Sequence, residues 1–184
     1  MEYFSLFFRK LIRYLLKPLS FVPAIVMMYL IFSFSGQTGG QSGQLSYKVS
    51  KILVLLYNKV LSKDLTNDAL NALIITIHPF VRKGAHVTEY FLLAASVAFP
   101  LYVYRLRGFL LTIIAGTFCV LFAALDEYHQ SFVSGRVASF RDIFIDSIGI
   151  FAGIILVRIV GYIGRKTVFS GLSMDKLKKK GSSK

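Results

Sequence analysis

The chain has 184 residues, of which 55% are apolar and 17% are charged. This composition excludes both an ordinary soluble domain and a disordered chain, and it predicts an integral membrane protein. The net charge of +13 would fit nucleic-acid binding, but the basic residues lie beside hydrophobic runs and no nucleic-acid motif accompanies them, so we expect no such partner.

The N-terminal residues 1–17 carry four basic side chains among Phe and Leu, which predicts an amphipathic segment on an anionic membrane surface. Residues 18–34 are uncharged and apolar, and they are just long enough to form a first membrane span. A signal peptide is the alternative, because Ser33, Phe34 and Ser35 resemble a cleavage site.

Two short amphipathic helices are expected in the segment that follows. Residues 36–46 are rich in Gly, Gln and Ser and predict a polar loop. Residues 49–61 and 69–81 are too short to span a membrane, but each has apolar positions spaced for one helical face. We expect both to lie along the membrane surface or to cap the bundle. His78 and Pro79 predict the end of the second helix, with His78 as a helix-end residue.

Three further apolar runs predict spans at 86–104, 108–125 and 143–164. Gly149 and Gly153 form a G-x-x-x-G pattern in the last of them, which predicts close helix packing. The expected fold is therefore all-α: an integral membrane bundle of four transmembrane helices with short amphipathic helices in the external loop between helices 1 and 2. The transmembrane domain covers 18–164, between the basic segment 1–17 and a basic cytoplasmic tail at 165–184.

The basic residues also predict an orientation. With the N-terminus inside, the inner segments hold 13 Lys and Arg in 40 residues, whereas the outer segments hold 8 in 68. This asymmetry places both termini in the cytoplasm of a multi-pass cell-membrane protein. The connection between the first two spans, and the one between the third and fourth, then lie at the outer face.

Ionisable residues gather at the outer ends of the predicted spans. His86 and Glu89 are three residues apart at the start of the second span, and Lys83 lies one turn earlier on the same face. Others flank the connection between the third and fourth spans: Asp126, Glu127, Arg136, Arg141, Asp142 and Asp146. Such groups usually face the bundle interior or a water-filled pocket. We therefore expect them to converge on one mouth of the bundle, and we interpret His129 as solvent-facing.

Three blocks of residues resemble the signature of VanZ-like membrane proteins. One block reads D-E-x-x-Q-x-F-x-x-G-R-x-x-S-x-x-D, followed by an acid and by G-x-x-x-G. Its residues here are Asp126, Glu127, Gln130, Phe132, Gly135, Arg136, Ser139, Asp142, Asp146, Gly149 and Gly153. The other blocks are Lys83, His86, Glu89 and Tyr90, and upstream Ser35, Gln37, Ser42 and Ser46. Two departures, Ser134 for proline and Gly36 for serine, concern loop geometry.

The resemblance implies a cell-envelope protein associated with resistance to glycopeptide antibiotics of the teicoplanin type. It covers Ser35 to about Gly153 and leaves the terminal segments outside. The expected partners are membrane lipids and a lipid-linked cell-wall precursor or a glycopeptide.

The residue types favour acid–base chemistry on a phosphate or pyrophosphate. The candidate catalytic residues are His86, Glu89, Asp126, Glu127 and Asp142, and the candidate substrate-binding residues are Lys83, Gln130, Arg136, Asp146, Ser35 and Gln37. A carboxylate such as Glu89 orients a histidine base such as His86. Arg136 would clamp the anion with its planar fork, and Asp142 would position it. The acidic pair Asp126 and Glu127 would supply acid–base groups or hold a metal.

Several functions fit these residues. The first is an enzyme, a hydrolase or transferase that acts on lipid-linked envelope precursors. A divalent cation is compatible with the carboxylates, although no H-x-x-x-H or C-x-x-C spacing is present. The alternatives are a buried ion network that ties the external turns together, a non-catalytic binder of a lipid-linked or glycopeptide ligand, and a small proton-coupled carrier.

Overall fold

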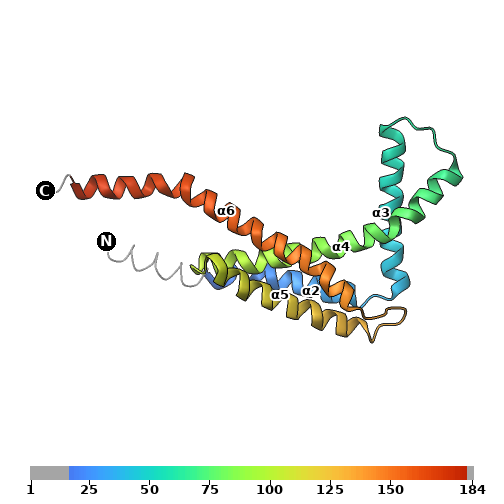
Figure 1. Ribbon diagram of the computed structural model, residues 1–184, viewed down its shortest axis with the longest axis horizontal. Coiled ribbons are helices and arrows are strands. Elements are labelled where there is room, and N and C mark those ends of the chain that lie inside the picture. Colours follow the sequence, from blue (N-terminus) through green and yellow to red (C-terminus); the bar gives the residue numbers. More distant parts are fainter. Residues whose placement is uncertain (1–16, 182–184) are drawn as a thin grey trace.

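The computed structural model describes the backbone of residues 17–181 and the side chains of residues 17–166, and within these ranges it contains helices and no strand (Figure 1). The helices are α2 (Val22–Ser35), α3 (Gly39–Val60), α4 (Asn67–Val103), α5 (Gly108–Gln130) and α6 (Phe140–Gly181). The predicted amphipathic segment at 1–17 lies, except for its last residue, outside the described part.

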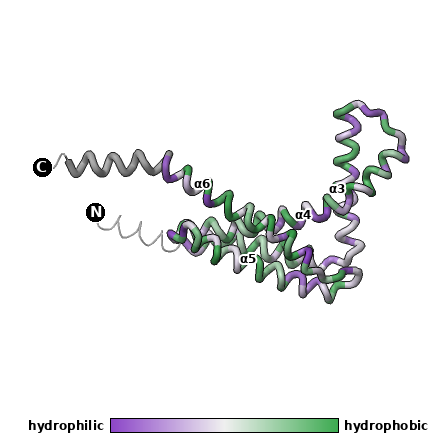
Figure 2. The backbone as a smooth tube through the Cα atoms, in the orientation of Figure 1, coloured by the Kyte–Doolittle hydropathy of each residue, from purple (hydrophilic) through white to green (hydrophobic). Residues whose placement is uncertain are grey.

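Four helices run beside one another and form the bundle, whereas α3 stands crosswise at one end of it (Figure 1). The segments long and apolar enough to cross a membrane are Lys17–Ser35, Asn67–Val103, Gly108–Gln130 and Phe140–Lys166. The predicted all-α fold with four membrane-spanning helices is therefore confirmed. Figure 2 shows apolar residues along most of the bundle and more polar ones in the loops near α3.

The surface of the bundle is largely apolar, as expected for helices that contact lipid. Phe109, Leu125 and Phe144 are 76%, 65% and 74% exposed. The interior consists instead of small and branched residues, such as Ala115 of α5 and Ile150 of α6, both fully buried. In a bilayer, close packing of this kind holds helices together, because lipid tails are as apolar as the side chains.

The contact between α4 and α6 uses the two glycines of the G-x-x-x-G pattern. A Cβ atom on Gly149 would collide with the carbonyl oxygen of Val87, and one on Gly153 with that of Phe91. The two backbones therefore lie closer than any side chain would allow. The predicted packing role of these glycines is confirmed.

Helix α3 begins ten residues earlier than expected, inside the segment read as a polar loop. Thr38 caps it: the Gln41 amide N–H donates to Thr38 Oγ1 over 3.3 Å, and the Thr38 amide N–H donates to Gln41 Oε1 over 3.2 Å. This reciprocal pair satisfies two amide groups that would otherwise lack partners at the helix start. The loop prediction was wrong for residues 39–46.

Helix α4 is continuous where two helices were expected. It passes through Pro79 without ending, so the predicted stop at His78 and Pro79 is wrong. An internal proline removes one helical hydrogen bond at a cost of about 3 kcal/mol. Contacts with α3 compensate at this point: His78 Nε2 lies 3.1 Å from both Ser46 Oγ and the Gly43 carbonyl oxygen. Instead of ending a helix, His78 therefore joins α4 to α3.

The third and fourth predicted spans are correctly placed, but their helices α5 and α6 extend further than expected. The fourth span continues without a break, since α6 runs on to Gly181 and takes in most of the predicted basic tail. In the first span, Ala24 and Ile31 of α2 are buried in the common core. This packing agrees with a retained span rather than with a signal peptide.

Candidate functional site

A cavity of about 280 Å³ lies at the end of the bundle that α3 crosses. Six of the candidate catalytic and substrate-binding residues line it: Ser35, Gln37, His86, Glu89, Asp126 and Arg136. Its remaining walls are mostly apolar and come from α2, α3 and α4, including Phe34, Leu45 and Val49. The cavity lining therefore combines charged side chains with apolar ones.

His86 and Glu89 pair with each other in the wall that α4 provides. His86 Nδ1 lies 3.5 Å from Glu89 Oε2, and the two side chains are 29% and 26% exposed. The carboxylate orients the ring and favours a proton on Nδ1, which leaves Nε2 to accept one. This arrangement suits a general base.

Asp126, at the end of α5, is buried in a hydrogen-bond network that joins three helices. Its Oδ2 accepts from Tyr90 Oη at 3.1 Å and from Gln130 Nε2 at 2.8 Å, and Gln130 Nε2 also donates to Ser35 Oγ at 2.7 Å. Asp126 Oδ1 has no partner, although the side chain is only 4% exposed. A buried polar atom without a partner is costly, so this oxygen is available to a ligand hydrogen.

Arg136 comes from the loop between α5 and α6 and is held by backbone carbonyls. Its Nε donates to the Gln37 oxygen at 3.0 Å and its Nη2 to the Phe34 oxygen at 3.1 Å, while Nη1 is buried without a partner. Burial, and after it the charge of Arg82, lowers the pKa of Arg136. The prediction that Asp142 positions Arg136 is wrong, because carbonyl groups at the end of α2 take that role.

The loop reaches the cavity because two glycines allow it to lie against α3. Gly135 has a φ of +76°, a conformation that other residues rarely adopt. A Cβ atom on Gly39 would collide with the Gly135 carbonyl oxygen, and the Gly39 amide donates to the Ser134 oxygen over 3.2 Å. The sequence Ser134-Gly135-Arg136 is thereby fixed beside the start of α3.

The other candidate residues lie near the cavity without lining it. They are Lys83, Glu127, Gln130, Asp142 and Asp146. Glu127 Oε1 accepts from the Ser139 amide at 2.6 Å and so holds the end of the loop. Asp146 is 6% exposed, and its Oδ1 lacks a partner.

No ion pair within 4.0 Å joins these acids to Lys83, Arg136 or Arg141 in the part of the chain that the structure describes. The alternative of a buried ion network is therefore wrong. Neutral donors hold Asp126, and a backbone amide holds Glu127.

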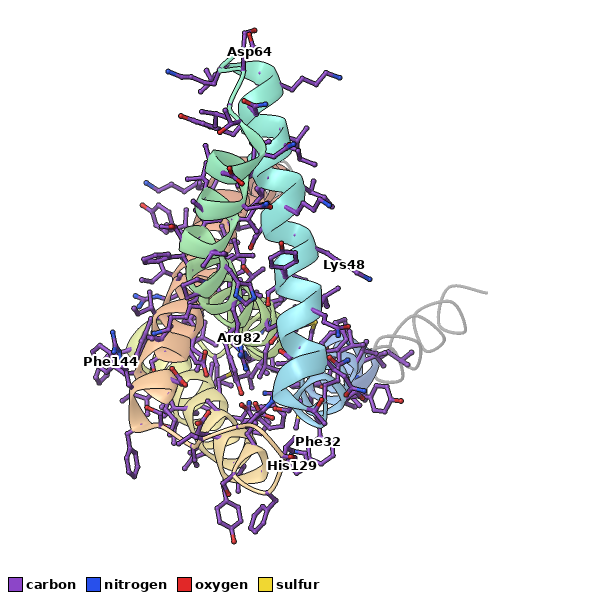
Figure 3. All side chains as sticks on the ribbon, turned by 90° about the vertical axis from the view of Figure 1, so that its right-hand side faces the viewer. Phe32, Lys48, Asp64, Arg82, His129 and Phe144 are labelled. Atoms are coloured by element: carbon purple, nitrogen blue, oxygen red, sulfur yellow. The ribbon has the colours of Figure 1, made fainter. Side chains whose placement is uncertain are left out.

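Arg82 is a second guanidinium in the cavity wall that the sequence prediction missed. Figure 3 shows it between α3 and the rest of the bundle, whereas Lys48 points away. Arg82 precedes His86 by four residues, so both share one face of α4. That spacing was visible in the sequence, but a helix expected to start at His86 concealed it.

Two side chains at this end, Ser46 and His129, were not among the candidate site residues. Ser46, which also lines the cavity, is 8% exposed and donates to the carbonyl oxygens of Ser42 and Gly43. His129 was expected to face solvent, but it is half-buried and stacks on Phe32 with ring centroids 4.3 Å apart. It is not among the residues that line the cavity, and Figure 3 shows it beside Phe32 at the bundle end.

Arg82 and Arg136 place two guanidinium groups in one small cavity, beside the carboxylates of Glu89 and Asp126. A guanidinium group suits the oxygens of a phosphate. A metal site has less support. Among the described residues, no group of three or more His, Cys, Asp or Glu side chains is arranged to hold an ion.

Comparison with known proteins gives one match. A protein-family model described as VanZ/LLP1 matches residues 20–161, a range that includes every cavity residue. No curated protein and no solved structure matches the chain.

Proposed function

The chain belongs to the VanZ/LLP1 family of membrane proteins, and on this premise we propose that its cavity takes the phosphate-bearing head group of a lipid-linked envelope precursor and hydrolyses or transfers it. The observation that supports this proposal is the composition of the cavity. Arg82 and Arg136 line the cavity together with the His86–Glu89 pair, and most of the other lining residues are apolar.

The position of the cavity along the bundle suits a lipid head group. Helix α5 has 23 residues, or about 35 Å, and the hydrocarbon core is about 30 Å thick. Asp126 and Gln130 lie in its last turn, so they stand at the boundary between hydrocarbon and water. The phosphates of membrane lipids occupy the same level. We place this end of the bundle at the outer face, from the distribution of Lys and Arg.

The chemistry assigns a role to each group. His86 Nε2 takes a proton from water, whose oxygen attacks the terminal phosphorus of a lipid diphosphate. The bond from that phosphorus to the bridging oxygen breaks, which leaves lipid monophosphate and inorganic phosphate. Arg82 and Arg136 stabilise the charge on the phosphoryl oxygens, and Glu89 stabilises the imidazolium that forms. In a transfer reaction, an acceptor hydroxyl takes the place of water.

The test uses full-length protein in liposomes that contain a polyprenyl diphosphate, with release of inorganic phosphate as the measurement. Wild type should release phosphate, and His86→Asn should be slower by about 100-fold or more, because a general base contributes that much. His129→Asn is the matched control, since this histidine stands at the same end of the bundle but outside the cavity.

Binding of the same lipid is measured in parallel. His86→Asn should bind as wild type does, and Arg82→Gln should bind less. If wild type binds the lipid but releases no phosphate, the chain is a non-catalytic binder and not an enzyme. If the wild-type protein neither binds the lipid nor releases phosphate, although a thermal unfolding transition shows that it is folded, the proposal is refuted.

A further inference from the structure

Three arginines gather in a pocket at the end of the bundle opposite the cavity. This arginine pocket has a volume of about 460 Å³, and Arg107, Arg158 and Arg165 line it with Tyr102 and Tyr162. We propose that the arginine pocket binds the phosphate of an anionic phospholipid whose acyl chain lies in an adjoining apolar groove. This site is separate from the cavity and does not depend on its function.

No acidic side chain that the structure describes lines the arginine pocket. The acidic residues with described side chains all lie elsewhere, at the cavity or on the hairpin that α3 and α4 form: Asp64, Asp68, Glu89, Asp126, Glu127, Asp142 and Asp146. Arg158 stands about two turns inside the apolar part of α6, where an arginine without a counter-charge is expensive. A phosphate group supplies that counter-charge with paired hydrogen bonds.

Two of the three arginines, Arg158 and Arg107, are held by neighbouring side chains. Arg158 Nη1 donates to Thr112 Oγ1 of α5 at 3.0 Å, and the Arg107 guanidinium lies 5.5 Å from the centre of the Tyr102 ring. Tyr102 is itself fixed, since its hydroxyl donates to the Gly161 oxygen at 2.7 Å. Side chains oriented in advance lose less entropy on binding an anion.

An apolar groove of about 560 Å³ adjoins the arginine pocket. Leu92 and Phe99 of α4 and Val160 of α6 line it, and it shares Tyr102 and Arg165 with the arginine pocket. One molecule can therefore place its phosphate among the arginines and its hydrocarbon chain in the groove. Inorganic phosphate or a soluble phosphate ester would leave the groove empty, which favours a lipid as the ligand.

The experiment titrates full-length protein in detergent with phosphatidylglycerol or phosphatidylcholine and counts bound lipids by native mass spectrometry. Phosphatidylglycerol should bind more tightly, because the choline cation opposes the arginines. Arg158→Gln should weaken phosphatidylglycerol binding by roughly tenfold or more, the effect of losing a charge-assisted hydrogen bond. Arg141→Gln, the same change at the other end of the bundle, should have no effect.

Two further variants and a competition with inorganic phosphate show whether the ligand is a lipid or free phosphate, and whether lost binding reflects misfolding. In Gly164→Phe the new ring should fill the groove, since a Cβ there meets no atom within 4 Å, and binding should weaken although every arginine remains. Arg165→Gln, near the end of the span, repeats the charge test if Arg158→Gln fails to fold. Equal binding of the two lipids would overturn the proposal, and so would release of bound phosphatidylglycerol by an equal concentration of inorganic phosphate.

Discussion

Replacing Gly149 with alanine tests the contact between α6 and α4, the helix that carries His86 and Glu89. The new Cβ would collide with the Val87 carbonyl oxygen and would also lie 3.0 Å from Val87 C and 3.1 Å from Phe91 N. These are backbone atoms, so no side chain can rotate away and the two helices must separate. Overpacking of this kind costs about 1–3 kcal/mol.

Gly116→Ala is the matched control, because Gly116 is also a buried glycine inside a bundle helix. A Cβ there meets Phe151 Cε1 at 3.7 Å and Ile154 Cδ1 at 3.8 Å, which are ordinary contacts. Alanine favours a helix over glycine by about 1 kcal/mol, but that gain is common to both variants and cancels between them. Gly149→Ala should therefore be less stable than Gly116→Ala by about 1–3 kcal/mol.

The measurement is reversible unfolding of the purified protein in mixed micelles, followed by the loss of helical circular dichroism as denaturing detergent is added. The difference between the two free energies of unfolding tests the reasoning directly. Equal free energies of unfolding for the two variants would show that α4 and α6 do not approach as closely as described.

Three other outcomes follow from the structure. Tyr90→Phe removes a buried hydrogen bond to Asp126 and should lower the free energy of unfolding by about 1–3 kcal/mol in the same assay; an unchanged value would mean that this hydrogen bond is absent. In a Cys119→Ala background, a cysteine at Gly43 should react with a membrane-impermeant thiol reagent in intact cells and one at Ser173 should not, and the reverse pattern would place the cavity in the cytoplasm. Expression in a susceptible Gram-positive host should reduce sensitivity to lipid-bearing glycopeptides more than to non-lipidated ones, since a lipid tail holds the drug at the bilayer surface where the cavity opens; equal sensitivity with and without the protein would rule out the resistance role.

The apolar runs predicted the bundle well because a membrane span is a property of composition and length. The starts and ends of helices were harder to predict. Thr38 and Gln41 form a capping-box pattern that predicts a helix start, yet the two glycines between them favoured a loop. Pro79 predicted a helix end because the cost of an internal proline is local, whereas the contacts of His78 with α3 that offset this cost are tertiary.

The candidate site, too, could be predicted only in part from the sequence. Spacing along one helix placed His86 and Glu89 together, and their pairing needs only the helical repeat. Nothing in the sequence indicates that Arg136 is held by the carbonyl groups of Phe34 and Gln37, because backbone carbonyls carry no residue identity. Arg82 was missed for a different reason: the error at Pro79 put it in a supposed connection.

Pro79 also affects how α4 deforms. Because proline lacks an amide hydrogen, the helix is most easily bent near this residue. On one side of it, His78 holds α3, whose Leu45 and Val49 form an apolar wall of the cavity; on the other, His86 belongs to the part of α4 packed against α6. A small change of direction at Pro79 would therefore move α3 relative to α6 and strain its contact with Ser134 and Gly135, while the Gly149 and Gly153 contacts and the His86–Glu89 geometry stay as they are.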